Sequence, residues 1–215
     1  MIFRLFLLLA VVCTTSCYSG QKSTDYLNAS MEDSLFLDKS PVCILGYDRY
    51  LYHLAYFKGN EVAALENTPD SGLIFQRYPN LNDRRLHSMN PVLLDSAVVG
   101  VTYDQALLYC QWRAENNRRT VTEKSKYRKL YLVQYGLPSP EDFKMAERLA
   151  ASRKDKSHWK QLFEGPPELT NVPGYVWVKS KEGGRLVPAT EVPAHEICFR
   201  CKAELLPWTG SSAFY

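Results

Sequence analysis

The chain has 215 residues, of which 46% are hydrophobic, so it is long enough to bury one sizeable core. Its 26 basic and 23 acidic residues leave a net charge of only +3, and its two arginine pairs, Arg84-Arg85 and Arg118-Arg119, are isolated. A nucleic-acid-binding surface needs a larger basic patch. Length, composition and charge therefore predict one folded domain and no nucleic-acid partner.

The N-terminal segment has the pattern of an export signal. Arg4 precedes an apolar run, Leu5 to Val12, that is too short to span a bilayer, and Thr14-Thr15-Ser16 places small residues before Cys17. The sequence Thr-Thr-Ser-Cys resembles the lipobox of bacterial lipoproteins, in which the cysteine is lipidated and becomes the first residue of the mature chain. Two or more acyl chains give a stable membrane anchor.

This resemblance implies a signal peptide over residues 1–16, lipidation of Cys17, and a lipid anchor and tether over residues 17–32. It places the protein in the bacterial cell envelope, attached to a membrane, with the outer membrane as the expected location. The alternative is an ordinary cleaved signal, which leaves Cys17 as a free thiol.

Two elements are predicted at the start of the domain. Residues 33–42 alternate apolar and polar side chains and predict a strand that Pro41 closes. Apolar side chains then recur at helical spacing and predict a helix that Gly59 ends. His53 lies off this apolar stripe, so we expect it to be exposed. The stripe consists of Tyr47, Tyr50, Leu51, Leu54 and Phe57.

The middle of the chain holds a long connection and then a capped helix. Residues 66–91 contain several prolines and glycines and predict a surface loop. Ala97 to Val101 is a short apolar run that predicts a buried strand. Thr102 occupies an N-cap position with Gln105 three residues later, the pattern of a capping box. The helix that follows places Tyr103, Ala106, Leu107, Cys110 and Ala114 on one face, which we expect to be buried.

Beyond a charged stretch at residues 116–131, where we expect this helix to end, a second strong helix begins. Ser139 is its N-cap, Pro140 takes the first helical position, and Glu141 and Asp142 complement the helix dipole. Its buried stripe is Phe143, Ala146, Leu149, Ala150 and Arg153.

The last part of the chain predicts strands. Residues 175–178 and 185–187 have the pattern of a hairpin that turns at Gly183-Gly184, and residues 197–203 predict a closing strand. The domain is expected to span residues 33–207, followed by a tail over 208–215.

Several of these segments, in this order, resemble the formylglycine-generating (sulfatase-modifying factor) domain family, most closely its variant in gliding-motility and secretion lipoproteins. DSLFLDKSPV with YDRYLYHL resembles the opening strand and helix, and VVGVTYDQALLYCQWR resembles the central strand and helix. LPSPEDFKMAERLA, YVWV and CFRC are similar to the later helix, a tryptophan-bearing segment and the terminal strand. The resemblance covers about residues 33–205. It implies an α+β fold related to C-type lectins, with two main helices packed on short antiparallel strands and long loops.

The chain differs from this family in the segment that carries the family's catalytic cysteines. Catalysis there is a copper-dependent oxidation by two cysteines four residues apart in a late segment, and thiolates suit Cu(I). This chain has no such pair, and its late region is short. We therefore expect a non-catalytic relative without a cofactor.

Four cysteines remain after the signal and anchor, an even number in an oxidising compartment, and they allow three disulfide pairings. Cys198 and Cys201 are three residues apart, so a strand would point them to opposite faces and disfavour a bond between them. The family resemblance implies that Cys110 pairs with Cys201, which leaves Cys43 for Cys198.

Other candidate sites have ordinary structural interpretations. His195, Cys198 and Cys201 resemble half of a zinc site that lacks a fourth ligand, so no metal is expected. The Cys-x-x-Cys lies in strand-like sequence, whereas a thioredoxin-like redox pair lies at a helix N-terminus. The four tryptophans suit core packing more than a sugar-binding surface. They are Trp112, Trp159, Trp177 and Trp208.

These observations lead to one main hypothesis and two alternatives. The main hypothesis is a lipid-anchored envelope protein whose domain is a scaffold or protein-binding module, with an envelope protein as partner, in gliding-motility or secretion machinery. The first alternative is a lipoprotein that binds glycan or peptidoglycan. The second is a copper-dependent oxidase with relocated cysteines.

Overall fold

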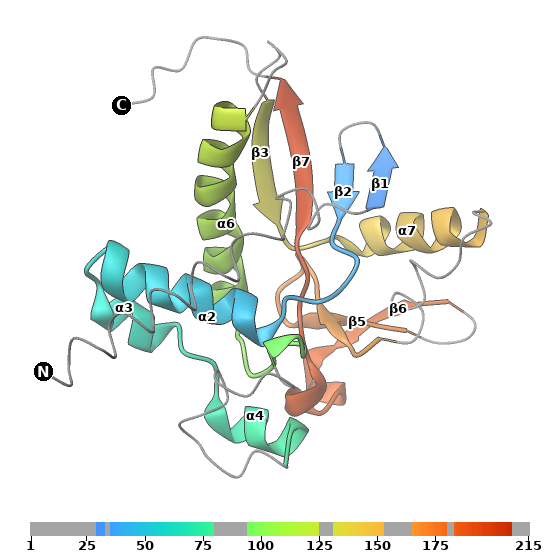
Figure 1. Cartoon of the computed structure of the whole chain (residues 1–215). Coiled ribbons are helices and arrows are strands. Elements are labelled where there is room, and N and C mark those ends of the chain that lie inside the picture. Colours follow the sequence, from blue (N-terminus) through green and yellow to red (C-terminus); the bar gives the residue numbers. More distant parts are fainter. Residues whose placement is uncertain are drawn as a thin grey trace, which may run out of the picture.

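The computed structural model describes residues 29–32, 35–79, 94–124, 131–152, 165–179 and 183–207. The predicted signal peptide, Cys17 and the C-terminal tail lie outside these residues. Helices pack with two small antiparallel sheets, so the α+β class is confirmed (Figure 1).

The larger sheet has the strand order β1-β2-β7-β3. Its members are β1 (Ala29–Glu32), β2 (Leu35–Leu37), β7 (Lys202–Pro207) and β3 (Tyr131–Gly136). β7 pairs with β2 over three residue pairs and with β3 over six. The last strand in the sequence is therefore central in the sheet. β1 lies within the range that the sequence assigns to the tether.

The smaller sheet consists of β4 (Glu168–Leu169), β5 (Tyr175–Val178) and β6 (Arg185–Pro188), in that order. β5 and β6 pair antiparallel, so the predicted hairpin is confirmed. Two 3-10 helices, η4 (Ala189–Glu191) and η5 (Ala194–Glu196), lead from this sheet towards β7.

The two strongest predicted helices are present with the expected caps. α6 (Tyr103–Lys124) begins after Thr102, whose Oγ1 accepts from the Gln105 amide at 3.3 Å, while Gln105 Oε1 accepts from the Thr102 amide at 2.9 Å. α7 (Pro140–Ser152) begins after Ser139. The α6 helix continues past residue 116 to Lys124 and lies alongside β3 (Figure 1).

The first predicted helix is also present, as α2 (Ile44–Tyr52), which continues directly into a π-helix, η1 (His53–Phe57). The expected loop over residues 66–91 is wrong in part, since α4 (Ser71–Arg77) lies within it, after α3 (Glu61–Glu66). The carboxylate of Asp70 caps α4 by accepting from the amides of Gly72 and Leu73. Residues 80–93 lie outside the described residues.

The predicted strand over Ala97 to Val101 is wrong, although its valines are buried. Only Ala97 forms a bridge, with Cys43. Gly100 has a φ of +74°, which breaks an extended run, and its carbonyl accepts from the Asp70 amide at 2.8 Å. A Cβ at Gly100 would lie 2.7 Å from the Asp70 carbonyl oxygen, so this close approach requires glycine.

Two other strand boundaries are corrected. The strand expected over residues 33–42 is regular only at β2, and the strand expected over 197–203 begins at Lys202 as β7. The segment after β2 and the segment before β7 are still joined to each other by single backbone hydrogen bonds. The Val42 amide donates to the Phe199 carbonyl at 2.8 Å, and the Asp38 amide donates to that of Cys201 at 3.0 Å.

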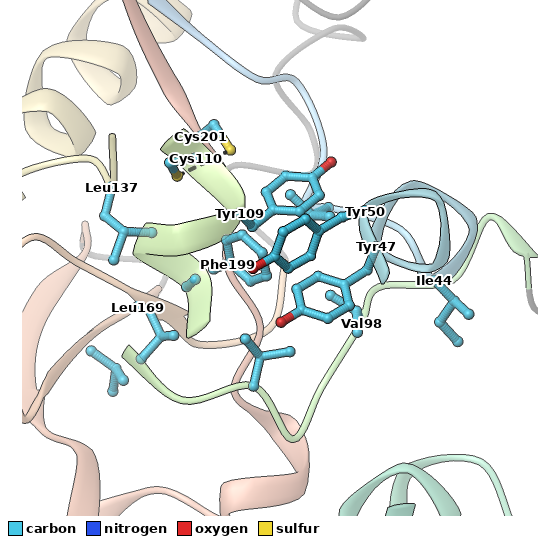
Figure 2. Packing of buried hydrophobic residues seen from close by; sticks show 14 of the residues in the cluster. Ile44, Tyr47, Tyr50, Val98, Tyr109, Cys110, Leu137, Leu169, Phe199 and Cys201 are labelled. Carbon is cyan, nitrogen blue, oxygen red and sulfur yellow. Dashed lines mark hydrogen bonds between the residues drawn. The ribbon is translucent and has the colours of Figure 1, made fainter. Parts of the chain in front are cut away.

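The main core is built around aromatic rings from α2, α6 and the segment before β7 (Figure 2). Tyr47 stacks on Tyr109 with ring centroids 5.5 Å apart, and the edge of Phe199 meets both. Burial raises the pKa of Tyr50 to about 12 and keeps its hydroxyl neutral. The Tyr47 hydroxyl donates to the Asn67 carbonyl at 3.0 Å, which satisfies a buried polar group.

Candidate functional site

Cys110 and Cys201 face each other in the main core (Figure 2). Their sulfurs lie 3.5 Å apart, and neither residue is more than 1% exposed. Both are free thiols in the structure. The hydrogen bond to Cys201, together with burial, raises the pKa of Cys110 well above its usual value. The pair that the family resemblance implies is therefore already placed sulfur to sulfur, and only a small approach separates it from a disulfide.

The other two cysteines lie apart from this pair. Cys43 is half-buried beside Gly46, whereas the thiol of Cys198 donates to the Pro167 carbonyl at 3.4 Å. Cys198 and Cys201 thus have different partners, as their spacing predicts. A disulfide between Cys43 and Cys198 stays a prediction, and no contact between the two thiols supports it.

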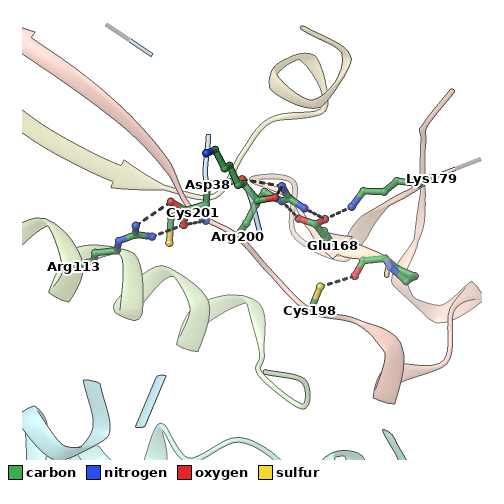
Figure 3. Close-up of polar contacts among 9 residues, drawn as sticks. Asp38, Arg113, Glu168, Lys179, Cys198, Arg200 and Cys201 are labelled. Carbon is green, nitrogen blue, oxygen red and sulfur yellow. Dashed lines mark hydrogen bonds and ion pairs between the residues drawn. The ribbon is translucent and has the colours of Figure 1, made fainter. Parts of the chain in front are cut away.

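A buried ion pair between Arg113 and Asp38 lies beside Cys201 (Figure 3). Arg113 of α6 binds both carboxylate oxygens of Asp38, which follows β2; the Nη2–Oδ1 distance is 2.9 Å. Asp38 Oδ2 also accepts from the Cys201 amide at 3.2 Å, and the Arg113 guanidinium lies 4.6 Å above the Tyr135 ring. This pair joins α6, β3 and the ends of β2 and β7.

A second buried cluster joins the two sheets (Figure 3). Arg200 binds Glu168 of β4 through two nitrogens, with Nη2 2.6 Å from Oε1, and Lys179 also donates to Glu168 Oε1. Arg200 Nη1 donates to the carbonyls of Asp38 and Lys39 at 2.8 and 3.1 Å. Glu168 and Arg200 are both 0% exposed. Asp38, Arg113, Glu168, Lys179 and Arg200 are called the buried charge network below.

The charges of this network determine one another's protonation states. Burial alone would raise the pKa of Glu168, but the adjacent Arg200 and Lys179 outweigh burial and lower it. Burial lowers the pKa of Lys179, and the nearby positive charge of Arg200 lowers it further, so that the two together outweigh the attraction of Glu168. The carboxylate of Glu168 is therefore ionised and occupied at both oxygens. This arrangement positions backbone segments, and it offers no free base to a substrate.

Local sequence patterns do not predict this network, because its members come from five separate segments of the chain. One signal was present, since Arg200 lies inside the otherwise apolar Ile-Cys-Phe-Arg-Cys segment. A charged side chain in an apolar strand-like run requires a buried partner. No local sequence pattern identifies Glu168 or Asp38 as that partner.

An exposed aromatic cluster covers the π-helix and α3. Its large apolar side chains are between 55% and 74% exposed: Tyr52, Tyr56, Phe57, Val62 and Leu65. Tyr52 and Tyr56 stack with centroids 4.5 Å apart, and Tyr52 meets the edge of Phe57 at 6.0 Å. Phe57, the last residue of the predicted apolar stripe, is exposed, because the π-helix shifts the helical register at the end of the stripe.

The histidines and tryptophans considered as candidate site residues pack against neighbouring side chains or lie outside the described residues. His53 is half-buried rather than exposed, and its ring packs on Phe57 and Trp112. His195 lies in η5, and among the described residues no three His, Cys, Asp or Glu side chains form a group that fits a metal ion. Trp177 is buried against Phe143. Trp159, Trp208, His87 and His158 lie outside the described residues.

Asp142 does more than complement the helix dipole. Its Oδ2 accepts from the Ser139 amide at 2.7 Å and from Lys202 Nζ at 3.0 Å, while its own amide donates to Ser139 Oγ at 3.1 Å. The N-terminus of α7 is thereby tied to the start of β7.

Comparison of the chain with family models, curated proteins and solved structures finds no match, so no catalytic family is identified. Within the part of the chain that the structure describes, no helix has both the length and the apolar character needed to cross a membrane.

Proposed function

We propose that this protein is a lipid-anchored envelope lipoprotein whose folded domain serves as a protein-binding module. The single observation that carries the protein-binding part is the exposed aromatic cluster. Large apolar patches on a folded domain mark interaction surfaces, and tyrosine and phenylalanine are enriched at the centres of protein interfaces. The Tyr52 ring already contacts the rings of Tyr56 and Phe57, so less side-chain entropy is lost when a partner covers them.

The partner that fits this surface is another envelope protein with an apolar patch. Lys58 and Glu115 form an ion pair at the side of the cluster, with an Nζ–Oε2 distance of 3.5 Å, and supply a polar rim of both signs. A rim with both charges is typical of protein interfaces around an apolar centre. Gliding-motility or secretion machinery is the setting that we propose from the family resemblance.

We also propose that the domain is a non-catalytic relative of the formylglycine-generating family, with that family's lectin-related fold. The order of the matching segments supports this proposal. It is supported further by the two capped helices beside short antiparallel strands and by the facing thiols of Cys110 and Cys201.

The protein-binding proposal is tested by photo-crosslinking in the intact envelope. A photoreactive phenylalanine analogue replaces Tyr56, and a matched probe replaces Tyr175, an exposed tyrosine on β5. We expect a discrete cross-linked protein from position 56 and not from position 175. The double variant Tyr56→Ser/Phe57→Ser should lose the partner without loss of stability, because both side chains are more than 70% exposed. Equal recovery of the same proteins from both positions would contradict the proposal.

The anchoring and non-enzymatic parts have separate tests. Cys17→Ser should abolish labelling by a fatty-acid analogue and release the protein from the membrane fraction. One bound copper ion per purified chain, lost in Cys198→Ser, would overturn the non-catalytic assignment.

A further inference from the structure

The exposed aromatic cluster lies on two rows of side chains that run side by side. The first row belongs to α2 and η1, and the second belongs to α3 (Figure 1). The chain reverses between the rows, and the Asn60 amide donates to the Leu54 carbonyl at 3.0 Å. At the other end of α3, the Asn67 carbonyl accepts from the Tyr47 hydroxyl of α2 at 3.0 Å. The start of α3 therefore lies beside the end of η1, and its end lies beside α2.

The first row has a cation at each end and is called the basic row below. It consists of Arg49, Tyr52, Tyr56 and Lys58, which are all exposed. Arg49 lies three residues before Tyr52, whose ring stacks on that of Tyr56, so the three side chains share one side of the helix. Lys58 pairs with Glu115, but both side chains are more than half exposed, so this pair contributes little and Lys58 can change partner. Among the described residues, Arg49 has no ion-pair partner.

The second row has a carboxylate at each end and is called the acidic row below. It consists of Glu61, Val62, Leu65 and Glu66, which are all exposed. Side chains four residues apart are neighbours on a helix, so these four lie on one side of α3. In the part of the chain that the structure describes, neither Glu61 nor Glu66 has an ion-pair partner. Two unpaired carboxylates therefore flank the apolar side chains of α3.

The apolar area of the two rows is large enough for a stable dimer. The large apolar side chains of the exposed aromatic cluster are between 55% and 74% exposed. At about 150 to 250 Å² for each aromatic side chain, the cluster presents roughly 600 Å² of apolar surface. A standard protein interface buries about 800 Å² on each partner, which includes a polar rim. The cluster together with its charged ends therefore has the area of one half of such an interface.

We propose that the exposed aromatic cluster binds the same surface of a second copy of this chain, about a two-fold axis parallel to the two rows. In a two-fold interface, if residue i of one copy contacts residue j of the other, then j also contacts i. With the axis in this direction, the basic row of each copy lies against the acidic row of the other. Arg49 then meets Glu66 of the second copy at one end of the rows, and Lys58 meets Glu61 of the second copy at the other end.

The distribution of charge favours a second copy over a partner with charges of one sign. A basic partner would face the like charges of the basic row, and an acidic partner would face those of the acidic row, which costs affinity. A second copy presents each row with its opposite. This inference rests on the protein-binding function proposed above, and it names the partner of that surface.

The test is sedimentation equilibrium of the whole chain, purified in a detergent that is matched in density to the solvent. We expect a dimer with a Kd of about 1 μM or lower, as for other interfaces of this size. Arg49→Glu and Glu66→Arg each place like charges together at two contacts and should weaken the dimer about a hundredfold. An equimolar mixture of these two variants should restore the dimer, because a mixed dimer has opposite charges at both contacts. Both residues are exposed, so neither variant should lose stability.

A matched charge reversal elsewhere on the chain is the control. Arg148→Glu changes an exposed cation of α7, outside the exposed aromatic cluster, and should leave the dimer unchanged. The proposal is overturned if the wild-type chain is monomeric at about 100 μM, one hundred times a Kd of 1 μM. It is equally overturned if the mixture of variants stays monomeric, or if Arg148→Glu weakens the dimer as much as Arg49→Glu.

Photo-crosslinking from position 56 separates this inference from the protein-binding function. A cross-linked product of two copies of the chain supports both. A product with a different protein and none with a second copy supports the protein-binding function and overturns the pairing of copies. The absence of any product contradicts both.

Discussion

Glu168 is the carboxylate that two buried cations, Arg200 and Lys179, share. Its carboxylate is 0% exposed and accepts from both Arg200 and Lys179, so it neutralises charge in a place that water does not reach. Two buried cations without their shared carboxylate would repel each other in a medium of low dielectric constant. The buried charge network is therefore asymmetric: it depends more on the one carboxylate than on either cation.

We predict that Glu168→Gln destabilises the domain by about 3 to 5 kcal/mol, the usual cost of breaking a buried ion pair from one side. Lys179→Met should cost less, because burial already disfavours the charged form of Lys179 and Arg200 remains paired. Chemical denaturation of both variants measures the difference. A smaller loss for Glu168→Gln than for Lys179→Met would contradict this account.

The same residue predicts a pH dependence. The pKa of Glu168 is lower in the folded state than its usual value, so the folded state binds fewer protons there than the unfolded state. Its stabilising contribution is therefore complete above the unfolded pKa of about 4.3 and is lost as the pH falls through the lower folded pKa. Unfolding free energies measured from pH 6 downwards should decline below about pH 4, and the decline should be smaller in Glu168→Gln.

A disulfide is the residue-scale prediction for Cys110 and Cys201. Their sulfurs are 3.5 Å apart, and a bond between them would close a loop of 91 residues, worth about 4 to 5 kcal/mol in the chain-entropy model. Non-reducing peptide mapping of the protein purified without reductant should find this pair joined. Reductant should lower the stability of Cys43→Ala, which cannot form the second predicted disulfide, but not that of the double variant Cys43→Ala/Cys110→Ala. A bond between Cys198 and Cys201 would refute the assignment.

At the scale of elements, the cap of α6 also connects two helices. Gln105 Nε2 donates to the Glu66 carbonyl at 2.8 Å, so the residue that completes the capping box also binds the end of α3. Thr102→Ala removes one cap bond and should cost about 1 kcal/mol. Gln105→Ala removes the reciprocal bond and the link to α3, and should cost more. Equal losses in denaturant unfolding would show that the link to α3 contributes nothing.

The capped helices were predictable because their signals are local. Thr102 with Gln105, and Ser139 with Pro140, specify a helix start within four residues, and both starts are confirmed. The strand predicted over Ala97 to Val101 was wrong because an apolar run indicates burial but not a pairing partner. Whether a buried segment joins a sheet depends on residues far away in the chain, such as Asp70, which binds Gly100.

At the scale of the whole molecule, the sequence predicts the mixed α+β class, the β5–β6 hairpin and the facing of Cys110 and Cys201 through the family resemblance. It does not predict the buried charge network, because this network arises where separate elements meet. Lys179 directly follows the predicted hairpin strand over residues 175–178, yet nothing local indicates that it binds Glu168 of β4. Contacts between distant elements follow from the complete fold and not from local patterns.

The central position of β7 has a consequence for how the protein is made. β2 and β3 both pair with β7, and the bond from the Cys201 amide to Asp38 joins residues 163 positions apart. A fold with such high contact order forms slowly, because long loops must close before their contacts can stabilise anything. The larger sheet cannot assemble until residues 202–207 have left the ribosome. The nascent chain therefore stays without this sheet until synthesis is almost complete, and a chain cut short before β7 would leave two strands without the neighbour that joins them.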